Sequence, residues 1–366
     1  MLPITIRAQR ADDYEAILRL TYKAFLTLDY PGRERMDEHF LIDLLKNSPS
    51  VMSELCFVAE CEGQIVGHIL YTKSAVLHAD GTETDTISFG PLSVLPSCHR
   101  QGVGAALVAH SMDVARGLGY GAVVITGVPE YYPKIGFQRG REYGLTLEDG
   151  TSPDPLMAYE LVPDYLSRGG ILSFSAPEYE RCETDHAGCA AFHRQFMAEH
   201  FPGQVTLRPF WDGDMALMER WLALPHVAKW YEHPADWLHE LVNRRGEFRF
   251  ISHFIAEIDG VPMGFGQYYD CFFTQQYEQW NAAWRIGERQ GETYSIDYLI
   301  GEEAYLRKGY GKEIVRLLTE KVQCLGARRI IVQPETDNAA SCGALAANGY
   351  RLAGEEWVKE FQRAEI

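Results

Sequence analysis

The sequence predicts an α/β protein of the α+β type, built from two tandem copies of one domain. Each copy is expected to hold a mixed, mostly antiparallel sheet flanked by helices. The length of 366 residues fits two domains that can each bury a core. Both halves show the same order of strand-like alternation and helix-like spacing. Glycines and leucines of the first half also recur in the second half at one fixed distance.

The repeat is carried by small and apolar residues in matching order. The residues Leu92, Gly102, Gly104, Leu118 and Gly119 recur as Leu299, Gly309, Gly311, Leu325 and Gly326. Each half also begins alike, with Thr5-Ile6-Arg7 and Thr206-Leu207-Arg208 both followed by a pair of aspartates. Because the matches keep their order through both halves, they indicate a duplicated domain.

Apolar patterns place the elements of each half. In the first half they predict strands over 4–9, 55–61, 64–77, 86–95, 122–127, 137–147 and 156–162, and helices over 11–25, 35–47, 102–117 and 130–135. In the second half they predict strands over 205–210, 249–258, 261–271, 293–300 and 329–333, and helices over 214–223, 234–245, 309–325 and 338–348. We expect domains over 1–180 and 205–366, with a linker over 181–204. Part of the segment 165–204 can complete the first sheet.

Composition and charge exclude several classes of protein. Hydrophobic residues make up 46% and charged residues 23%, as in ordinary globular proteins, and no apolar run is long enough to span a membrane. The first residues lack the pattern of a signal peptide, so we expect a cytoplasmic protein. Both halves are acidic within a net charge of −17, which argues against nucleic acid or an anionic membrane as partner. The acidity favours a cationic substrate such as an amine, or serves solubility alone.

The eight cysteines carry no recognisable metal or redox motif. No C-x-x-C occurs, and no set of Cys and His has zinc-finger spacing, so no metal site is predicted. We expect reduced thiols, as in a cytoplasmic protein. Cys182 and Cys189 form the one close pair outside a predicted core, and a metal site or a disulfide there stays an alternative.

A glycine turn lies between a predicted strand and a predicted helix in each half. The turns read His99-Arg100-Gln101-Gly102-Val103-Gly104 and Leu306-Arg307-Lys308-Gly309-Tyr310-Gly311. A helix start exposes unpaired backbone N–H groups and the positive end of the helix dipole. Glycines let a diphosphate approach these amides, and basic side chains add charge. The pattern predicts two phosphate-binding turns, although a purely structural turn stays open.

Known phosphate-binding loops narrow the choice of ligand. The Walker A pattern G-x-x-x-x-G-K-[ST] is absent. The dinucleotide fingerprint needs a third glycine, where the first half has Leu107, and its turn follows predicted antiparallel strands. A cofactor with a diphosphate of another kind therefore fits best.

The order of elements around these turns resembles the GNAT acetyltransferase superfamily, whose motif is Q/R-x-x-G-x-G/A. His99 and Leu306 depart from its first position, whereas both glycines of each turn are kept. The resemblance implies acetyl-CoA as cofactor, with its diphosphate at the turns and its pantetheine along the preceding strands. The cofactor-binding residues implied are Leu92, Ser93, Val94, Arg100, Gln101, Gly102, Val103, Gly104 and Ala105 in the first half, and Leu299, Ile300, Arg307, Lys308, Gly309, Tyr310, Gly311, Lys312 and Asn338 in the second.

The first half most resembles small bacterial acetyltransferases of this superfamily. It closes with Tyr131-Tyr132-Pro133-Lys134-Ile135-Gly136-Phe137. Tyr132 matches the family's tyrosine four residues before a Gly-Phe pair, and the resemblance implies that it protonates the departing CoA thiolate. A role in packing alone is the alternative.

The second half is similar to the aminoglycoside 6′-N-acetyltransferases. The similarity lies in Pro225-His226-Val227-Ala228-Lys229-Trp230, Gly264-Phe265-Gly266-Gln267-Tyr268-Tyr269 and Ser295-Ile296-Asp297-Tyr298-Leu299. It implies that Asp297 faces the acceptor amine and that Gln267 and Tyr269 line its pocket. Trp280 and Trp284 lie in an insertion that matches a substrate-flanking loop. Leu345 and Gln333 stand where that family has a tyrosine and an acidic residue.

Transfer of an acetyl group to an amine needs no protein nucleophile. The ammonium must first lose a proton, which a carboxylate can accept, and strand amides can stabilise the oxyanion. Asp297 is therefore the predicted proton acceptor, with a solvated strand-end carboxylate as the alternative. In the first half His68 is a candidate base, although such a histidine can equally be a buried core residue. Cys98 beside the turn is interpreted as incidental, because no base is paired with it.

These observations predict an acetyl-CoA-dependent N-acetyltransferase acting on a primary amine of a small cationic acceptor, with an aminoglycoside among the candidates. They leave open the acceptor, the oligomeric state and which copy is active. The alternative is a non-catalytic CoA-binding or sensor protein made of two degenerate copies, as His99, Leu306 and Leu345 would suggest. A nucleotide-dependent enzyme such as a kinase is a third hypothesis.

Overall fold

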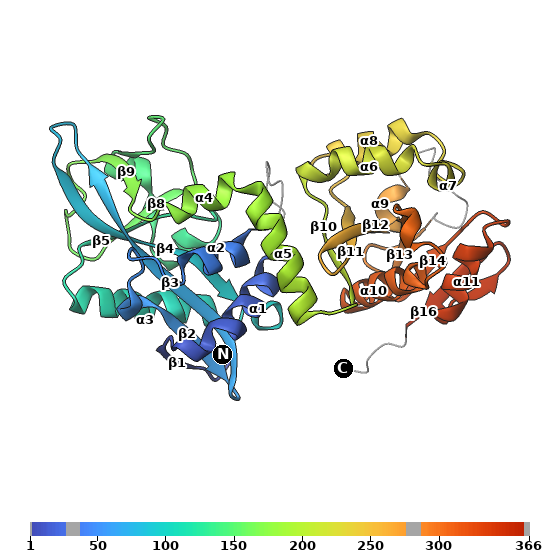
Figure 1. The fold of residues 1–366 in the computed structure, drawn as a ribbon, viewed down its shortest axis with the longest axis horizontal. Helices are drawn as coiled ribbons and strands as arrows, with labels where there is room; N and C mark the ends of the chain where they lie inside the picture. The colour runs from blue at the N-terminus through green and yellow to red at the C-terminus, as the bar shows by residue number, and fades with distance from the viewer. Residues whose placement is uncertain (1, 27–36, 276–286, 362–366) are drawn as a thin grey trace. The chain divides into compact units, whose positions relative to one another are not determined.

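The computed structural model describes residues 2–26, 37–275 and 287–361, which form two separate sheets (Figure 1). The chain divides into an N-terminal unit, whose described residues are 2–26 and 37–192, and a C-terminal unit over 193–275 and 287–361. The change between units falls within helix α5 (His186–His200). The expected domain limits at 180 and 205 stay a prediction.

The N-terminal sheet is mixed and mostly antiparallel. Its order is β1 (Thr5–Ala8), β2 (Phe57–Cys61), β3 (Gln64–Leu77), β4 (Glu83–Val94), β5 (Ala122–Thr126), β8 (Leu156–Glu160) and β6 (Gln138–Arg139). Only β4 and β5 pair in parallel along this order. Off this path, β9 (Gly170–Phe174) pairs with β3 and with β7 (Leu145–Thr146).

Helices cover both faces of this sheet. They are α1 (Tyr14–Phe25), α2 (Glu38–Leu45), α3 (Val103–Gly117) and α4 (Glu178–Thr184). On β4, Ser93 bonds Thr21 of α1 through their hydroxyls at 2.9 Å, whereas its neighbour Leu92 packs into the core beneath α3. Because successive strand residues point to opposite faces, α1 and α3 lie on opposite sides.

The C-terminal sheet repeats this order without the extra strands. It runs β10 (Val205–Pro209), β11 (Ile251–Ile258), β12 (Val261–Asp270), β13 (Thr293–Ile300), β14 (Arg329–Val332), β16 (Glu356–Glu360) and β15 (Arg351–Ala353), and only β13 and β14 pair in parallel. The helices are α6 (Met215–Leu222), α7 (Pro225–Ala228), α8 (Pro234–Val242), α9 (Cys271–Thr274), α10 (Tyr310–Cys324) and α11 (Ala339–Ala347). The predicted fold class is confirmed in both units.

Alternating side chains assign the two faces of the C-terminal sheet. Ile255 and Phe265 pack in a cluster beneath α6 and α8. Phe254 and Ala256 pack with residues of α10 and α11 on the other side. Figure 1 shows the sheet between these two helical layers.

The structure differs from the sequence-based elements in three places. The continuous strand expected over 137–147 is wrong, since 3₁₀ turn Gly140–Tyr143 separates the two-residue strands β6 and β7. The segment expected as a linker holds α5 and most of α4. The short helix near 130–135 is a 3₁₀ turn, Tyr132–Ile135. The prediction that part of 165–204 completes the first sheet is confirmed by β9.

Candidate active site

The glycine turn of the N-terminal unit follows a left-handed path into α3. After the 3₁₀ turn Pro96–Cys98, Arg100 has φ of 60° and Gly102 has φ of 88°. A left-handed conformation is costly for most residues and free of cost for glycine, which explains the glycine at this helix start. Arg100 and Gln101 are exposed, and the Gln101 amide donates to the Ser97 carbonyl at 2.9 Å.

The turn of the C-terminal unit has the same backbone. The 3₁₀ turn Glu303–Tyr305 leads to Arg307 with φ of 60° and Gly309 with φ of 86°, directly before α10. A Cβ added at Gly309 would meet no atom within 4 Å. The second copy thus repeats the strained arginine and the glycine, although Leu306 and Lys308 differ from their counterparts.

Both helices begin with amides that no cap satisfies. Gly102 and Gly309 have no side chain, so neither provides a capping hydrogen bond. The first backbone bonds recorded after the turns run from Ala106 N to Gly102 O at 2.9 Å and from Glu313 N to Gly309 O at 3.3 Å. The amides of residues 103–105 and 310–312 therefore face out of the helix ends, where the helix dipole favours an anion.

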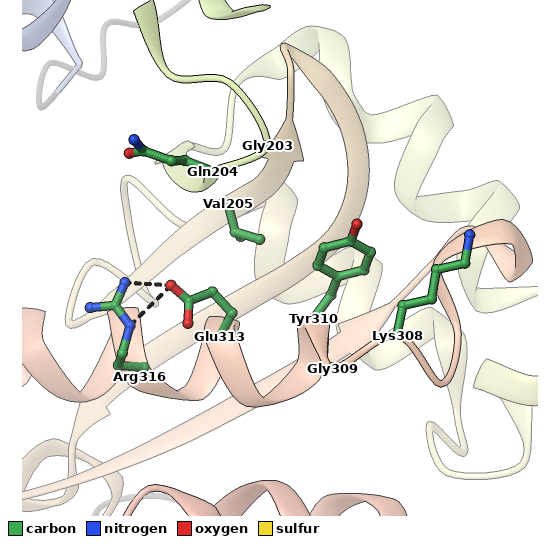
Figure 2. Close-up of a pocket in the computed structure, with 8 residues that line it drawn as sticks. All are labelled: Gly203, Gln204, Val205, Lys308, Gly309, Tyr310, Glu313 and Arg316. Carbon is green, nitrogen blue, oxygen red and sulfur yellow. Dashed lines mark hydrogen bonds and ion pairs between the residues drawn. The ribbon is translucent and has the colours of Figure 1, made fainter.

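A pocket of about 480 Å³ adjoins the second turn. Figure 2 shows the residues that line it. Lys308, Gly309 and Tyr310 line it together with Glu313 and Arg316, which form an ion pair along α10. Residues 203–205 close its other side. Of the other predicted residues, Lys312 is exposed and Asn338 caps α11 by accepting from Ser341 N at 3.1 Å.

Each sheet splays open beside its turn. The strands β4 and β5 pair only at Ile87 and Val123, yet β4 continues to Val94. In the C-terminal unit, β13 pairs with β14 only at Thr293 and Tyr294, and β13 continues to Ile300. The ends of β4 and β13, which hold the predicted strand residues Leu92–Val94 and Leu299–Ile300, lie past the last pair.

Side chains already bond some carbonyls at these strand ends. Tyr231 donates its hydroxyl to the Tyr298 carbonyl at 2.7 Å, and His226 lies 3.0 Å from the Ile300 carbonyl through Nε2. In the N-terminal unit, Nε2 of His99 lies 2.9 Å from the carbonyl of Val94. A ligand that pairs with these carbonyls must share them or displace the side chains.

Polar side chains form one row across the C-terminal sheet, on the face beneath α6 and α8. The strand register places His253 opposite Gln267 and Gln267 opposite Asp297. The Gln267 amide donates to Asp297 Oδ2 at 3.1 Å, while its own Oε1 is buried without a hydrogen bond among the described residues. Glu240 of α8 bonds Nε2 of His253 at 2.9 Å, with both side chains buried. The predicted residues Gln267 and Asp297 are thus brought together.

The same row in the N-terminal unit is apolar. Leu70 lies at the β3 irregularity opposite the Gly90–Pro91 stretch of β4, where the C-terminal unit has its carboxylate. The peptide bond between Gly90 and Pro91 is cis. Tyr179 donates its hydroxyl to the Gly90 carbonyl at 3.3 Å. This unit therefore lacks an acid at the position that corresponds to Asp297.

The two adjacent tyrosines of the N-terminal unit have different surroundings. The ring of Tyr132 lies 5.8 Å from that of Phe89 on β4 and against Gly127, where an added Cβ would sit 2.3 Å from the ring. Tyr132 therefore spans the splayed strands β4 and β5. The hydroxyl of Tyr131 lies 2.9 Å from the position of a Cβ on Gly104, so it covers the second glycine of the turn.

The remaining predicted residues lie in buried positions or outside the described residues. Tyr269 is buried with Phe248 and Ile251. His68 is fully buried, bonds Gln9 at 2.9 Å, and burial lowers its pKa to about 3, which makes it an unsuitable base. Trp280 and Trp284 lie outside the described residues.

Among the described residues, the cysteines and acidic side chains were also compared with what a disulfide or a metal site requires. All eight cysteines, Cys98, Cys182 and Cys189 among them, are free thiols. Within the described ranges, no cluster of three or more His, Cys, Asp or Glu side chains could hold a metal ion. In that same part of the chain, no helix is long and apolar enough to cross a bilayer.

Sequence reasoning missed two polar features of the C-terminal site. Glu240 and His253 come from different elements, and only the packing of α8 on β11 brings them together. Tyr298 reaches Ser341 of α11 through a hydroxyl–hydroxyl bond of 2.8 Å. The alternation of β13 could have assigned Tyr298 to the face of α10 and α11, but not its partner.

Two protein-family models match the chain, one in each unit. A model described as "Acetyltransferase (GNAT) family" matches residues 16–137. A model described as "Acetyltransferase (GNAT) domain" matches residues 211–356. Together the two matches span more than half of the chain.

Curated relatives are acetyltransferases by name. An uncharacterized N-acetyltransferase, YjhQ of Escherichia coli (strain K12), is 32% identical over 98 residues, or 27% of this chain and 54% of that protein. An aminoglycoside N(6′)-acetyltransferase type 1 of Klebsiella pneumoniae is 27% identical over 122 residues, or 32% of this chain and 58% of that protein. The chain thus spans little more than half the length of these relatives.

Solved structures show partial similarity. The GNAT family N-acetyltransferase YhbS of Escherichia coli in complex with CoA has 23% identity and a TM-score of 0.43, covering 50% of this chain and 94% of its own. The aminoglycoside acetyltransferase AAC(6′)-Ib in complex with coenzyme A and kanamycin has 23% identity and a TM-score of 0.38, covering 43% of this chain and 95% of its own.

Proposed function

The chain belongs to the GNAT family of acetyltransferases, and on this premise we propose that its C-terminal unit acetylates a primary amine of a small cationic acceptor. The observation that carries the proposal is the pairing of two features in that unit. An uncapped glycine turn lies at the end of β13, and the carboxylate of Asp297 lies on the same strand. An anionic donor and a cationic acceptor would then meet at one strand.

Acetyl-CoA is the proposed donor, and it supplies the acetyl group as an activated thioester. The residues present fit its diphosphate, because the amides of 310–312 are uncapped and Gly309 leaves open space in front of them. Arg307 and Lys308 are exposed beside the turn and add positive charge. The strand edge at Leu299 and Ile300 is the proposed site for pantetheine.

Asp297 is the proposed acceptor-side group. Its carboxylate can hold an ammonium by charge and then take the proton that the amine must lose before it attacks the thioester. Gln267 fixes one oxygen of that carboxylate through its amide. The buried Oε1 of Gln267, which no described residue bonds, adds a second acceptor for an N–H donor in the same row.

The acceptor class we propose is a small polyamine of the aminoglycoside type. The net charge of −17 attracts cations over long range. The relative that is named an aminoglycoside N(6′)-acetyltransferase supports the same class of acceptor. Tyr269 is proposed to shape the pocket wall next to Gln267.

The N-terminal unit is proposed to bind a second CoA at its own turn. Its residues 103–105 offer the same uncapped amides, and Tyr132 spans the splayed strands where the thioester would lie. Because this unit has the Gly90–Pro91 stretch where Asp297 would be, it would need another acceptor group for an amine. A mainly structural or regulatory copy is consistent with that difference.

The proposal is tested by measuring acetyl transfer to a panel of amines with Asp297→Asn. We expect kcat to fall roughly a hundredfold, because the carboxylate no longer accepts a proton. The Kd for CoA, measured by calorimetry, should stay within about twofold. Asp236→Asn on α8 is the matched control, since Asp236 is an exposed carboxylate of the same unit. Wild-type turnover in Asp297→Asn would remove Asp297 from the reaction.

A non-catalytic CoA-binding or sensor protein is the second candidate function. It is favoured by the side chains that bond the strand-end carbonyls of Tyr298 and Ile300. It is also favoured by Leu345, which is fully buried and cannot donate a proton. Tight CoA binding without release of free thiol, over the whole amine panel, would support the sensor and contradict the enzyme.

A further inference from the structure

Tyr298 crosses the space between two helix starts in the C-terminal unit. Its side chain leaves β13 on the face that packs against α10 and α11. The ring lies 3.8 Å from the position of a Cβ on Gly311, in the first turn of α10. Its hydroxyl bonds the Ser341 hydroxyl at 2.8 Å, in the first turn of α11. The phenol is therefore next to the glycine turn and directly beside the splayed end of β13.

A phenol also covers the second turn glycine in the N-terminal unit, where it comes from a different element. There Tyr131 lies over Gly104, and Tyr132 follows it across the splayed strands. Both belong to the segment that follows β5. In the C-terminal unit the corresponding segment holds Leu345, which is fully buried in the core. The strand thus supplies the phenol that the helix does not.

We propose that Tyr298 is a catalytic residue of the C-terminal unit and donates a proton to the thiolate that leaves the acetyl donor. This inference rests on the proposed function, because it requires acetyl-CoA at the second turn. It assigns to a residue of β13 a task that the buried and apolar Leu345 of α11 cannot perform.

The proposed step balances as follows. The amine nitrogen forms a bond to the acetyl carbon, and the carbon–sulfur bond breaks with its electron pair on sulfur. The phenol of Tyr298 gives its proton to that sulfur and recovers one from solvent by way of the Ser341 hydroxyl. Asp297 first takes a proton from the ammonium and passes it to solvent, and then takes the proton that the nitrogen loses as the amide forms. The products are the amide and a free thiol.

The surroundings of Tyr298 keep its phenol protonated. Burial raises its pKa to about 12, against a smaller opposing effect of the bond to Ser341. The Cys342 thiol is the titratable group of α11 that acts on it. A phenol that stays protonated at neutral pH can serve as a donor throughout the working range.

Tyr298→Phe tests the proposal in the full-length chain, with the N-terminal turn disabled by Gly102→Asp so that one unit binds CoA. We expect kcat to fall tenfold or more, because the leaving thiolate loses its proton donor. The Kd for CoA should change by less than about threefold. The thiol pKa of bound CoA, read from thiolate absorbance, should rise by about one unit, a tenfold change in its ionisation.

Tyr294→Phe is the matched control. Tyr294 lies four positions earlier on β13 and packs on the same face, but against Tyr268 rather than at the helix starts. The same loss of one hydroxyl there should leave kcat and the thiol pKa of bound CoA unchanged.

Two outcomes would overturn the inference. Unchanged kcat in Tyr298→Phe would show that the hydroxyl is not the donor. Tighter CoA binding in Tyr298→Ala, with kcat of Tyr298→Phe intact, would show that the ring only obstructs the passage. Failure of the proposed function looks different, because the unsubstituted chain would then bind no CoA or transfer no acetyl group.

Discussion

The two units agree most closely in the charged residues beside their first strands. In the N-terminal unit, Arg7 of β1 donates to both oxygens of Asp13 at 2.7 and 2.8 Å and through Nε to Glu60 at 2.9 Å. The Arg10 amide also donates to Asp13. This network ties β1 to β2 and to the start of α1.

The C-terminal unit repeats the network with more burial. Arg208 donates to Asp214 at 2.7 and 2.8 Å and through Nε to Glu257 at 2.6 Å. Its Glu257 side chain is 2% exposed, against 28% for the glutamate of the N-terminal unit. His193 adds a contact to Glu257 at 3.2 Å, and the guanidinium lies 4.1 Å from the Trp211 ring.

The contrast lies on the face of the sheet where we propose that the acceptor binds. The networks and the glycine turns match between units, whereas the pair of Asp297 and Gln267 has the Gly90–Pro91 stretch and Leu70 as its counterpart. What both units keep is what folding and the proposed cofactor binding require. The proposed acceptor face differs between them, so we infer that the two units do not share one acceptor.

The largest expected effect comes from removing the arginine of each network. Arg208→Met removes the guanidinium from the buried carboxylates of Asp214 and Glu257, which should destabilise the C-terminal unit by about 3–5 kcal/mol. Urea unfolding followed by tryptophan fluorescence measures this unit alone, because all seven tryptophans lie beyond residue 204.

Arg7→Met is the matched variant in the N-terminal unit. The loss should be smaller there, because water reaches the Glu60 side chain and solvates it. Hydrogen exchange of the β1 and β2 amides reports that loss. Equal losses in the two units would mean that burial does not set the strength of these networks.

The next prediction tests whether both glycine turns bind CoA. Gly309→Asp and Gly102→Asp each place a negative charge at uncapped amides, so each should weaken CoA binding at its own turn roughly a hundredfold. Calorimetry should then show one CoA site in each variant and two in the unsubstituted chain. Gly309→Ala separates strain from charge, since its left-handed φ of 86° is costly but no atom is within 4 Å. Two sites remaining in Gly309→Asp would contradict the proposed turn.

The turns could be predicted because their cause is local. A glycine with positive φ before a helix is required by the backbone itself, so Gly102 and Gly309 are visible as a repeated pattern in the sequence. The apolar pattern likewise predicted the strand over 293–300, which is β13. The contact of Gln267 with Asp297 follows from register once the strands are paired.

The rest of the site depends on packing between distant elements. The Glu240–His253 pair needs α8 to lie on β11, and the bond from Tyr298 to Ser341 needs α11 to lie beside β13. The hydrophobic periodicity of a sequence does not predict which distant elements pack against each other. The interruption between β6 and β7 has the same origin, since β7 pairs with the distant β9 rather than continuing β6.

A smaller effect is expected from acid, which should lower the stability of the C-terminal network by protonating Glu257. Burial alone would raise the pKa of Glu257, but Arg208 and His193 lower it from 4.5 to about 2. Because the folded pKa is depressed, this stability is complete above the ordinary pKa and is lost as pH falls from about 4.5 toward 2. Tryptophan-monitored unfolding across this range should show the loss. In Arg208→Met the decline should disappear, and an unchanged decline there would assign it to other carboxyl groups.

The smallest effect asks whether the N-terminal unit is itself a catalyst. Tyr132→Phe keeps the ring against Phe89 and Gly127 and removes only the hydroxyl. With the C-terminal turn disabled by Gly309→Asp, any remaining acetyl transfer comes from the N-terminal unit. If Tyr132 donates to the leaving thiolate, that transfer should fall about tenfold while thermal stability stays the same. Equal transfer by Gly309→Asp with and without Tyr132→Phe would leave Tyr132 a packing residue. The absence of transfer in both variants would make the C-terminal unit the one that catalyses.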